Sequence, residues 1–216
     1  MSQVDADPPR VLGVLLAGGQ ARRMGGGDKC LRQLGGKPIL AHVIERIRPQ
    51  VDALVLNANG DPARFDAFGL PVLPDVIEGH AGPLAGVLTG MEWVRAERPD
   101  CPWIVTVATD TPFLPADLVE VMNAALRREG AKLAHAASNG RAHPVFGLWP
   151  VALATALRSA MVDEGIRKVV AFTERYPLAE AGFPAQPFDP FFNTNRPEDL
   201  AEAERLIAAS APSGQA

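Results

Sequence analysis

The sequence predicts an α/β fold, a single domain with a mostly parallel sheet and helices on both of its faces. Continuous apolar runs such as Val11–Leu16 and Trp103–Ala108 are typical of buried parallel strands. Segments with helical spacing of apolar residues alternate with such runs up to residue 128, and this alternation of strands and helices is typical of the fold class. The chain has 216 residues, 47% of them hydrophobic and 21% charged, which suits one domain with one core.

The first predicted unit is a strand, a loop and a helix. Val11–Leu16 contains no polar side chain and leads into the glycine-rich segment 17–29. Pro38 suits the first turn of a helix, because the N–H that it lacks would have no partner there in any case. Apolar residues recur behind it at helical spacing for about ten residues, so this helix should pack on the sheet.

Three further strands and two helices are expected before the alternation of strands and helices ends near residue 131. The strands are Ala53–Leu56, Leu70–Leu73 and Trp103–Ala108, and each ends at residues that favour turns. One helix should span residues 83–95 and another residues 115–128, because a proline stands at the start of each.

A change of pattern after residue 131 predicts a hairpin insertion. Two strand-like segments, Lys132–Ala137 and Pro144–Trp149, flank Asn139-Gly140, a dipeptide typical of tight hairpin turns. Three helices should follow, over about residues 150–161, 164–174 and 197–209, the last with Asn195 or Arg196 at its cap. Segments 1–10 and 210–216 are expected to be disordered, so the predicted domain spans residues 11–209.

Charge and cysteine content disfavour some classes of protein without excluding them. A net charge of −4 and a pI of about 5.6 provide no basic field for nucleic acid. Cys30 and Cys101 form no C-x-x-C pair, which suits a reducing compartment. The sequence contains no stretch of 18 apolar residues and begins with an acidic, proline-containing segment, so we expect a cytoplasmic protein without membrane contact.

The glycine-rich segment 17–29 is suited to bind a polyphosphate. Glycines let backbone N–H groups approach phosphate oxygens, and the cations Arg23 and Lys29 can neutralise the phosphate charge. The segment is not a Walker A loop, because Cys30 follows Lys29 where Ser or Thr would hold a metal. The Rossmann spacing of glycines is absent as well.

Polar residues follow several predicted strands, at the edge where α/β proteins bind ligands. Asp110 follows Trp103–Ala108 and could hold Mg²⁺ or cap a turn. Asn57 and Asp75 could contact a nucleoside or serve turns, and Asn59 is a weaker candidate of the same kind. The remaining candidates are Asn193 and Asn195, which are two positions apart and could place a metal or phosphate, although a helix cap explains Asn195 equally well.

Taken together, the motifs of this chain resemble those of the molybdenum cofactor guanylyltransferase family, in the same order and across nearly the whole length. They are Leu16-Ala17-Gly18-Gly19, Arg23-Met24-Gly25-Gly26, Asp28-Lys29, Asp75, Gly82-Pro83-Leu84-Ala85-Gly86, Thr109-Asp110-Thr111-Pro112, His143-Pro144 and Asn193-Thr194-Asn195. One departure is Ala108-Thr109, where family members often have Pro-Cys.

The resemblance implies a Rossmann-like nucleotidyltransferase fold and an enzyme that moves GMP from GTP to the terminal phosphate of molybdenum-molybdopterin, releasing pyrophosphate. It implies Mg²⁺ as cofactor, held by Asp110, and Arg23, Lys29 and Asp110 as catalytic residues. It further implies protein partners that deliver molybdopterin, and apo-molybdoenzymes or their chaperones that receive the product. The implied nucleotide-binding residues are Leu16, Ala17, Gly18, Gly19, Lys29, Asn57, Asp75, Asp110, Asn193 and Asn195.

Three alternatives remain open at this stage. Related cytidylyltransferases usually have Leu-Ala-Ala-Gly in the first loop, so Gly18 favours guanine if an added methyl group crowds the base. Sugar-phosphate nucleotidyltransferases share the first loop but are typically longer and lack the Asn193-Thr194-Asn195 ending. A non-catalytic adaptor that binds a nucleotide and delivers the cofactor is the third alternative.

Overall fold

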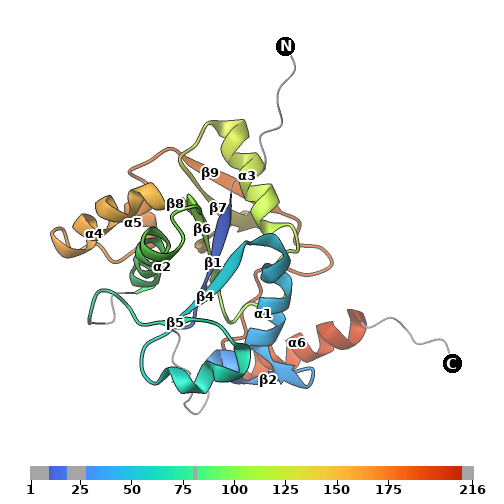
Figure 1. Ribbon diagram of the computed structural model, residues 1–216. Coiled ribbons are helices and arrows are strands. Elements are labelled where there is room, and N and C mark those ends of the chain that lie inside the picture. The colour runs from blue at the N-terminus through green and yellow to red at the C-terminus, as the bar shows by residue number, and fades with distance from the viewer. Residues whose placement is uncertain (1–9, 19–27, 80–81, 211–216) are drawn as a thin grey trace.

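The computed structural model describes residues 10–18, 28–79 and 82–210, and a mixed sheet lies at its centre (Figure 1). The strands of this sheet are β1 (Val11–Leu16), β4 (Ala53–Asn57), β5 (Val72–Leu73), β6 (Trp103–Ala108), β7 (Leu133–Ser138), β8 (Arg141–Pro150) and β9 (Leu178–Phe183). The short strands β2 (Gln33–Leu34) and β3 (Lys37–Pro38) pair separately. The helices are α1 (Ile39–Ile47), α2 (Pro83–Glu97), α3 (Leu118–Glu129), α4 (Ala154–Val162), α5 (Val169–Thr173) and α6 (Pro197–Ser210).

The large sheet has seven strands in the order β5-β4-β1-β6-β8-β7-β9. Neighbours pair in parallel except at β8, which is antiparallel to both β6 and β7. The carboxyl ends of the other strands therefore meet at one edge of the sheet. This arrangement confirms the predicted mostly parallel sheet with a hairpin insertion.

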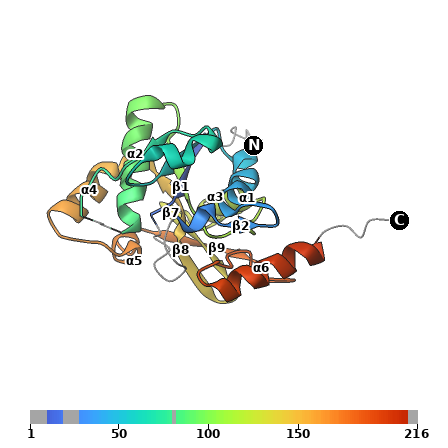
Figure 2. The same cartoon turned by 90° about the horizontal axis from the view of Figure 1, so that it is seen from below.

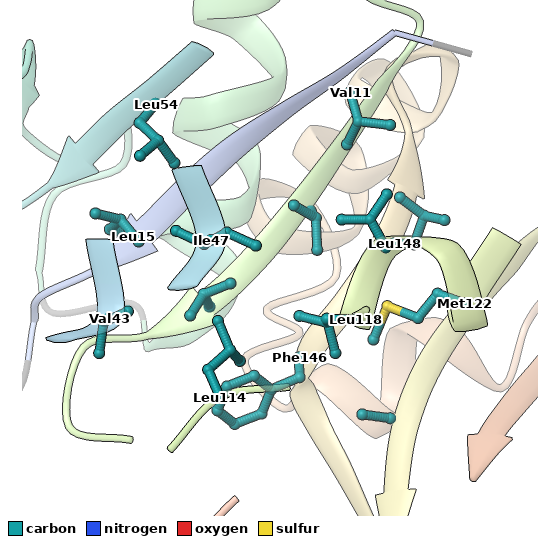
Figure 3. Packing of buried hydrophobic residues seen from close by; sticks show 14 of the residues in the cluster. Val11, Leu15, Val43, Ile47, Leu54, Leu114, Leu118, Met122, Phe146 and Leu148 are labelled. Carbon is teal, nitrogen blue, oxygen red and sulfur yellow. The ribbon is translucent and has the colours of Figure 1, made fainter. Parts of the chain in front are cut away.

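Helices cover both faces of the sheet, as predicted (Figures 1 and 2). Alternate residues of β1 point to opposite faces, so Leu15 packs with α1 and α3, whereas Val14 packs with α2, α4 and α5. Figure 3 shows the first of these clusters, in which Ile47 of α1 and Met122 of α3 lie over the strands. A smaller cluster joins α6 to β2 through Ala203 and Leu34.

The turn between β7 and β8 confirms the hairpin prediction. Asn139 has φ 50° and Gly140 has φ 71°, so both central residues adopt the left-handed conformation that a type I′ turn requires. Asn tolerates this conformation and Gly adopts it without strain. The insertion of β8 between β6 and β7 follows from this turn.

Several predicted boundaries were wrong. The helix predicted from residue 115 begins at Leu118, because Asp117 has a non-helical conformation (φ −120°, ψ 19°). The helix predicted over residues 164–174 is limited to α5, since Gly165 lies in the left-handed region (φ 69°). The third strand is shorter than predicted, and β9 was not predicted at all. Disorder was predicted for segments 1–10 and 210–216, of which residues 1–9 and 211–216 lie outside the described residues. Ser210 is instead the last residue of α6.

Candidate active site

Lys29 and Asp110 meet at the carboxyl edge of the sheet. Lys29 follows the loop after β1, and Asp110 lies just beyond the end of β6. Lys29 is only 8% exposed to solvent. Its ammonium donates hydrogen bonds to the carboxylate of Asp110 and to Oδ1 of Asn195. Three residues predicted from the sequence, Lys29, Asp110 and Asn195, are therefore in contact with one another through the Lys29 ammonium. The charges of Lys29 and Asp110 are partly shielded from water.

A pocket of about 340 Å³ opens beside this ion pair, and we call it the strand-end pocket. Its walls come from the carboxyl ends of β1, β4 and β6, from the segment after β5, and from the start of α2, with one residue of β8. The lining residues are Leu16, Gly18, Lys29, Asn57, Asn59, Asp75, Gly82, Pro83, Ala108, Thr109, Asp110 and Val145. Six of them belong to the nucleotide-binding set expected from the sequence: Leu16, Gly18, Lys29, Asn57, Asp75 and Asp110.

Amide groups fix the carboxylate of Asp75 in this pocket. Asn57 Nδ2 donates to Asp75 Oδ1 at 2.9 Å, and Asn59 Nδ2 donates to Asp75 Oδ2 at 2.8 Å. The Oδ1 of Asn59 also accepts the backbone N–H of Asp75 at 2.8 Å. Each carboxylate oxygen retains a further acceptor site, so Asp75 presents a fixed, acceptor-only edge. The signal for Asn59 in the sequence was its place two residues after Asn57.

Gly86 in the first turns of α2 allows the helix to approach the pocket wall. A Cβ built on Gly86 would lie 2.3 Å from Asn57 Oδ1 and 2.5 Å from Leu16 Cδ2. Separations this short require a neighbouring atom to move, so glycine is needed at this position. Gly86, the last residue of the motif 82–86, thus allows α2 to pack closely against Asn57.

Hydrogen bonds join the end of β6 to its surroundings. Thr109 Oγ1 donates to the Leu16 carbonyl at 3.1 Å, which ties β6 to β1. Thr194 donates to the Asp110 carbonyl from its backbone N–H at 3.0 Å and from Oγ1 at 3.1 Å. Thr111 Oγ1 donates to Asn193 Oδ1 at 2.7 Å. The segment 193–195 is therefore laid against the residues that follow β6.

The start of α6 shows how Asn195 is used. Asp199 Oδ2 accepts the backbone N–H groups of Asn195 at 2.9 Å and of Arg196 at 2.8 Å. Asp199 thereby satisfies donors that a helix start leaves without partners. The side chain of Asn195 is directed to Lys29 instead.

Cys30 lies next to Lys29 and is buried. Burial raises the pKa of the Cys30 thiol from 9.0 to about 11, and a hydrogen bond with Thr109 opposes this effect only in part. At neutral pH this cysteine is a protonated, apolar neighbour of the pocket.

Of the other predicted site residues, the structure describes some and not others. Ala17 is buried behind the pocket, where its N–H donates to the Asn57 carbonyl at 2.9 Å. Arg23 and Gly19 lie outside the described residues. Within the described ranges, no group of three or more His, Cys, Asp or Glu residues could hold a metal. Asp110 supplies one carboxylate and Asn195 one amide oxygen, which suits a hard cation that takes its other ligands from phosphate and water.

This fold and this pocket define the class of nucleotidyltransferases, enzymes that bind a nucleoside triphosphate at the carboxyl edge of such a sheet. A model of the "MobA-like NTP transferase domain" matches residues 13–178. The chain belongs to this family. No helix in the described part of the chain has both the length and the apolar character needed to cross a membrane.

Curated relatives resemble the chain over almost its whole length. A molybdenum cofactor guanylyltransferase of Bradyrhizobium sp. (strain ORS 278) is 59% identical over 92% of this chain and 93% of its own length. Another of that name, from Rhodopseudomonas palustris (strain BisB5), is 56% identical over 93% of this chain and 96% of its own.

Solved structures share the fold. Molybdopterin-guanine dinucleotide biosynthesis protein A of Archaeoglobus fulgidus has a TM-score of 0.70 at 24% identity, covering 92% of this chain and 99% of that one. A 4-diphosphocytidyl-2C-methyl-D-erythritol synthase of Anaerococcus prevotii has a TM-score of 0.68 at 12% identity, covering 93% and 96%. At these identities the likeness concerns the fold alone.

Proposed function

We propose that the chain transfers GMP from GTP to the terminal phosphate of molybdenum-bound molybdopterin. An oxygen of that phosphate forms a bond to the α-phosphorus, the bond from the α-phosphorus to the bridging oxygen breaks, and pyrophosphate leaves with the electron pair. The Lys29–Asp110 pair beside the strand-end pocket is the observation that carries this proposal. The names of the relatives at 56% and 59% identity support the choice of substrates.

Lys29 is placed to neutralise the triphosphate. Its ammonium is buried, and a charge in a low-dielectric site acts more strongly on a phosphate than a solvated one does. Both reactants are anions and the attacking phosphate is already ionised, so positioning and charge neutralisation replace a protein nucleophile or a strong base. We assign Arg23 to the same phosphates on the basis of its place in the glycine-rich segment.

Mg²⁺ fits the donor set as the metal of this site. Asp110 would hold it through the carboxylate, with Asn195 as a neighbouring oxygen donor. A bound Mg²⁺ supplies charge neutralisation and polarises phosphoryl oxygens. Asp110 and Asn195 already lie together on the Lys29 ammonium, so the chain gathers cation, carboxylate and amide at one point.

Asp75 supports guanine as the base. Its carboxylate only accepts hydrogen bonds, and the amides of Asn57 and Asn59 hold it in place. The pairing edge of guanine presents adjacent N–H donors, whereas cytosine presents a single amino donor next to an acceptor nitrogen that would face the carboxylate. The pocket therefore favours GTP over CTP.

The test is pyrophosphate release with Mg²⁺ and molybdenum-molybdopterin, with GTP and CTP compared as donors and a sugar phosphate as alternative acceptor. We expect rapid release with GTP and the pterin acceptor, and slow release with the other pairs. GTP binding without release would indicate the adaptor. The cytoplasmic location and the cofactor-delivering and cofactor-receiving protein partners belong to this proposal, and they rest on the sequence and on the family.

A further inference from the structure

Ser138, at the carboxyl end of β7, is buried and joins two segments that are far apart in sequence. Its Oγ lies 2.8 Å from Nε2 of His143 on β8, and it donates to Oδ1 of Asp189 at 2.8 Å. A carboxylate only accepts hydrogen bonds, so the hydroxyl proton of Ser138 is directed to Asp189. His143 Nε2 must then be the donor to Ser138, and the hydrogen bonds run in one direction from His143 to Asp189.

The same carboxylate fixes the chain that follows β9. Asp189 Oδ1 also accepts the backbone N–H of Phe191 at 2.9 Å. The ring of Phe191 is 3% exposed and stacks on the His143 ring, with 4.6 Å between centroids. Phe146 and Phe183 meet the Phe191 ring edge-on at 4.8 and 5.4 Å. The Asp189 side chain is thus held by Ser138 of β7, and the Phe191 ring is held by residues of β8 and β9.

This segment leads directly to Asn193 and Asn195. Asn193 and Asn195 are exposed residues whose side chains contact Thr111 and Lys29. Their positions depend on the chain on either side, which Asp189 holds before them and α6 holds after them. A loss of the Ser138–Asp189 bond would release the first of these supports.

The hydrogen-bonded group of Ser138, His143 and Asp189, which we call the anchor, is separate from the strand-end pocket. The lining described for that pocket includes Val145 of β8 but not Ser138, His143 or Asp189. In the strand order, β6 with Asp110 at its end separates β1, β4 and β5 from β8, β7 and β9. The strand-end pocket proposed for the nucleotide lies mainly on the first side of Asp110, which would leave the second side for a phosphorylated acceptor.

We infer that Ser138, His143 and Asp189 are positioning residues that hold segment 189–195 in the geometry needed by the phosphorylated acceptor, and that GTP binding depends on them less, through the contact of Asn195 with Lys29 alone. This inference rests on the proposed function. It gives His143 of the His143-Pro144 motif a positioning role.

The test compares Ser138→Ala with Ser159→Ala, since Ser159 makes the same kind of bond to Asp163 on α4, away from the site. Ser138→Ala should raise KM for the acceptor or lower kcat by about tenfold or more, because small displacements of a substrate are costly. The Kd of GTP should change clearly less, because Gly18, Asn57 and Asp75 of the strand-end pocket do not belong to the displaced segment. Asp189→Asn keeps an oxygen acceptor and should remain close to the wild type, whereas Asp189→Ala should behave like Ser138→Ala.

A second measurement tests whether Ser138 holds residues 189–195 in place, and it needs no acceptor substrate. Amide hydrogen exchange of residues 189–195 in the full chain should become faster in Ser138→Ala by up to about tenfold, the effect of one lost hydrogen bond, and stay unchanged in Ser159→Ala. Unchanged exchange, or equal losses for GTP and acceptor, would overturn the inference. A wild type that exchanges as expected but transfers no GMP would instead refute the proposed function alone.

Discussion

The ammonium of Lys29 contacts the carboxylate of Asp110 although the two residues are 81 positions apart in sequence. The side chains are 10% and 24% exposed, so each charge would lack a full solvent shell without the other. In the proposed reaction a metal-bound triphosphate would offer both groups a new partner, the metal for Asp110 and the phosphates for Lys29. The ion pair therefore holds the two groups in place before the nucleotide binds.

Replacement of Asp110 by Asn should nearly abolish transfer while keeping the shape of the side chain. Loss of one electrostatic contact of this kind lowers the rate by about 10²–10³. The measurement is the rate of pyrophosphate release at saturating GTP and Mg²⁺. Asp66→Asn, on the exposed surface of the segment 62–68, is the matched control. Full activity of Asp110→Asn would remove this residue from the site.

Replacement of Gly86 by Ala should weaken GTP binding. The new Cβ would lie 2.3 Å from Asn57 Oδ1 and would displace the amide that holds Asp75. Overpacking of this kind costs about 1–3 kcal/mol, so we expect the Kd of GTP to rise by about tenfold. Titration calorimetry can measure it.

Gly182→Ala is the control for that variant, because no described atom lies within 4 Å of a Cβ built there. Unfolding curves of both variants show whether the fold is retained. Wild-type affinity of Gly86→Ala for GTP would mean that α2 does not constrain Asn57.

Replacement of Gly18 by Ala should change the choice of base. Gly18 lines the strand-end pocket, and no described atom lies within 4 Å of a Cβ built on it, so the methyl group would occupy pocket space. One methyl group in a pocket changes specificity by about 10-fold or more. We expect the ratio of kcat/KM for GTP over CTP to fall, measured with both nucleotides in competition. An unchanged ratio would contradict the steric explanation for Gly18.

The cysteines should be unreactive in the folded protein. Burial raises the pKa of Cys30 to about 11 and also raises the pKa of Cys101. Thiolate is the reactive form, so at pH 8, well below the pKa of Cys30, alkylation should be slow, and it should become faster only as the pH rises toward that pKa. After denaturation both thiols should react at once. Fast labelling of native Cys30 at pH 8 would show that the site opens.

The sequence was sufficient for elements whose residues carry their own signal. Val11–Leu16 and Trp103–Ala108 were predicted with their observed bounds, because both runs are apolar apart from Thr106 and such runs are typical of buried strands. The strand Leu178–Phe183 was missed, since its small Ala and Gly residues give no periodic signal and pairing with β7 defines it. Gly165 prevents the helix predicted over residues 164–174 from beginning at residue 164, through a backbone conformation that helical spacing does not reveal.

The candidate site could be predicted as far as strand topology determines it. Lys29, Asp75 and Asp110 line one pocket because the ends of parallel strands share one edge. The contact of Asn59 with Asp75 across 16 positions depends on how side chains pack. The same holds for the Ser138–Asp189 bond across 51 positions, and neither has a local pattern in the sequence.

The reversed direction of β8 has a consequence for how this protein can evolve. Because β8 stands between β6 and β7, the half of the sheet with β7 and β9 is connected to the half with β1, β4 and β5 through one antiparallel strand. Mutations in β7 and β9 can accumulate without changing the pairing of β1, β4 and β5. The chain after β9 is constrained where Asn193, Thr194 and Asn195 contact Thr111, Asp110 and Lys29. The choice of acceptor can therefore diverge among descendants of this fold while the use of the triphosphate is inherited unchanged.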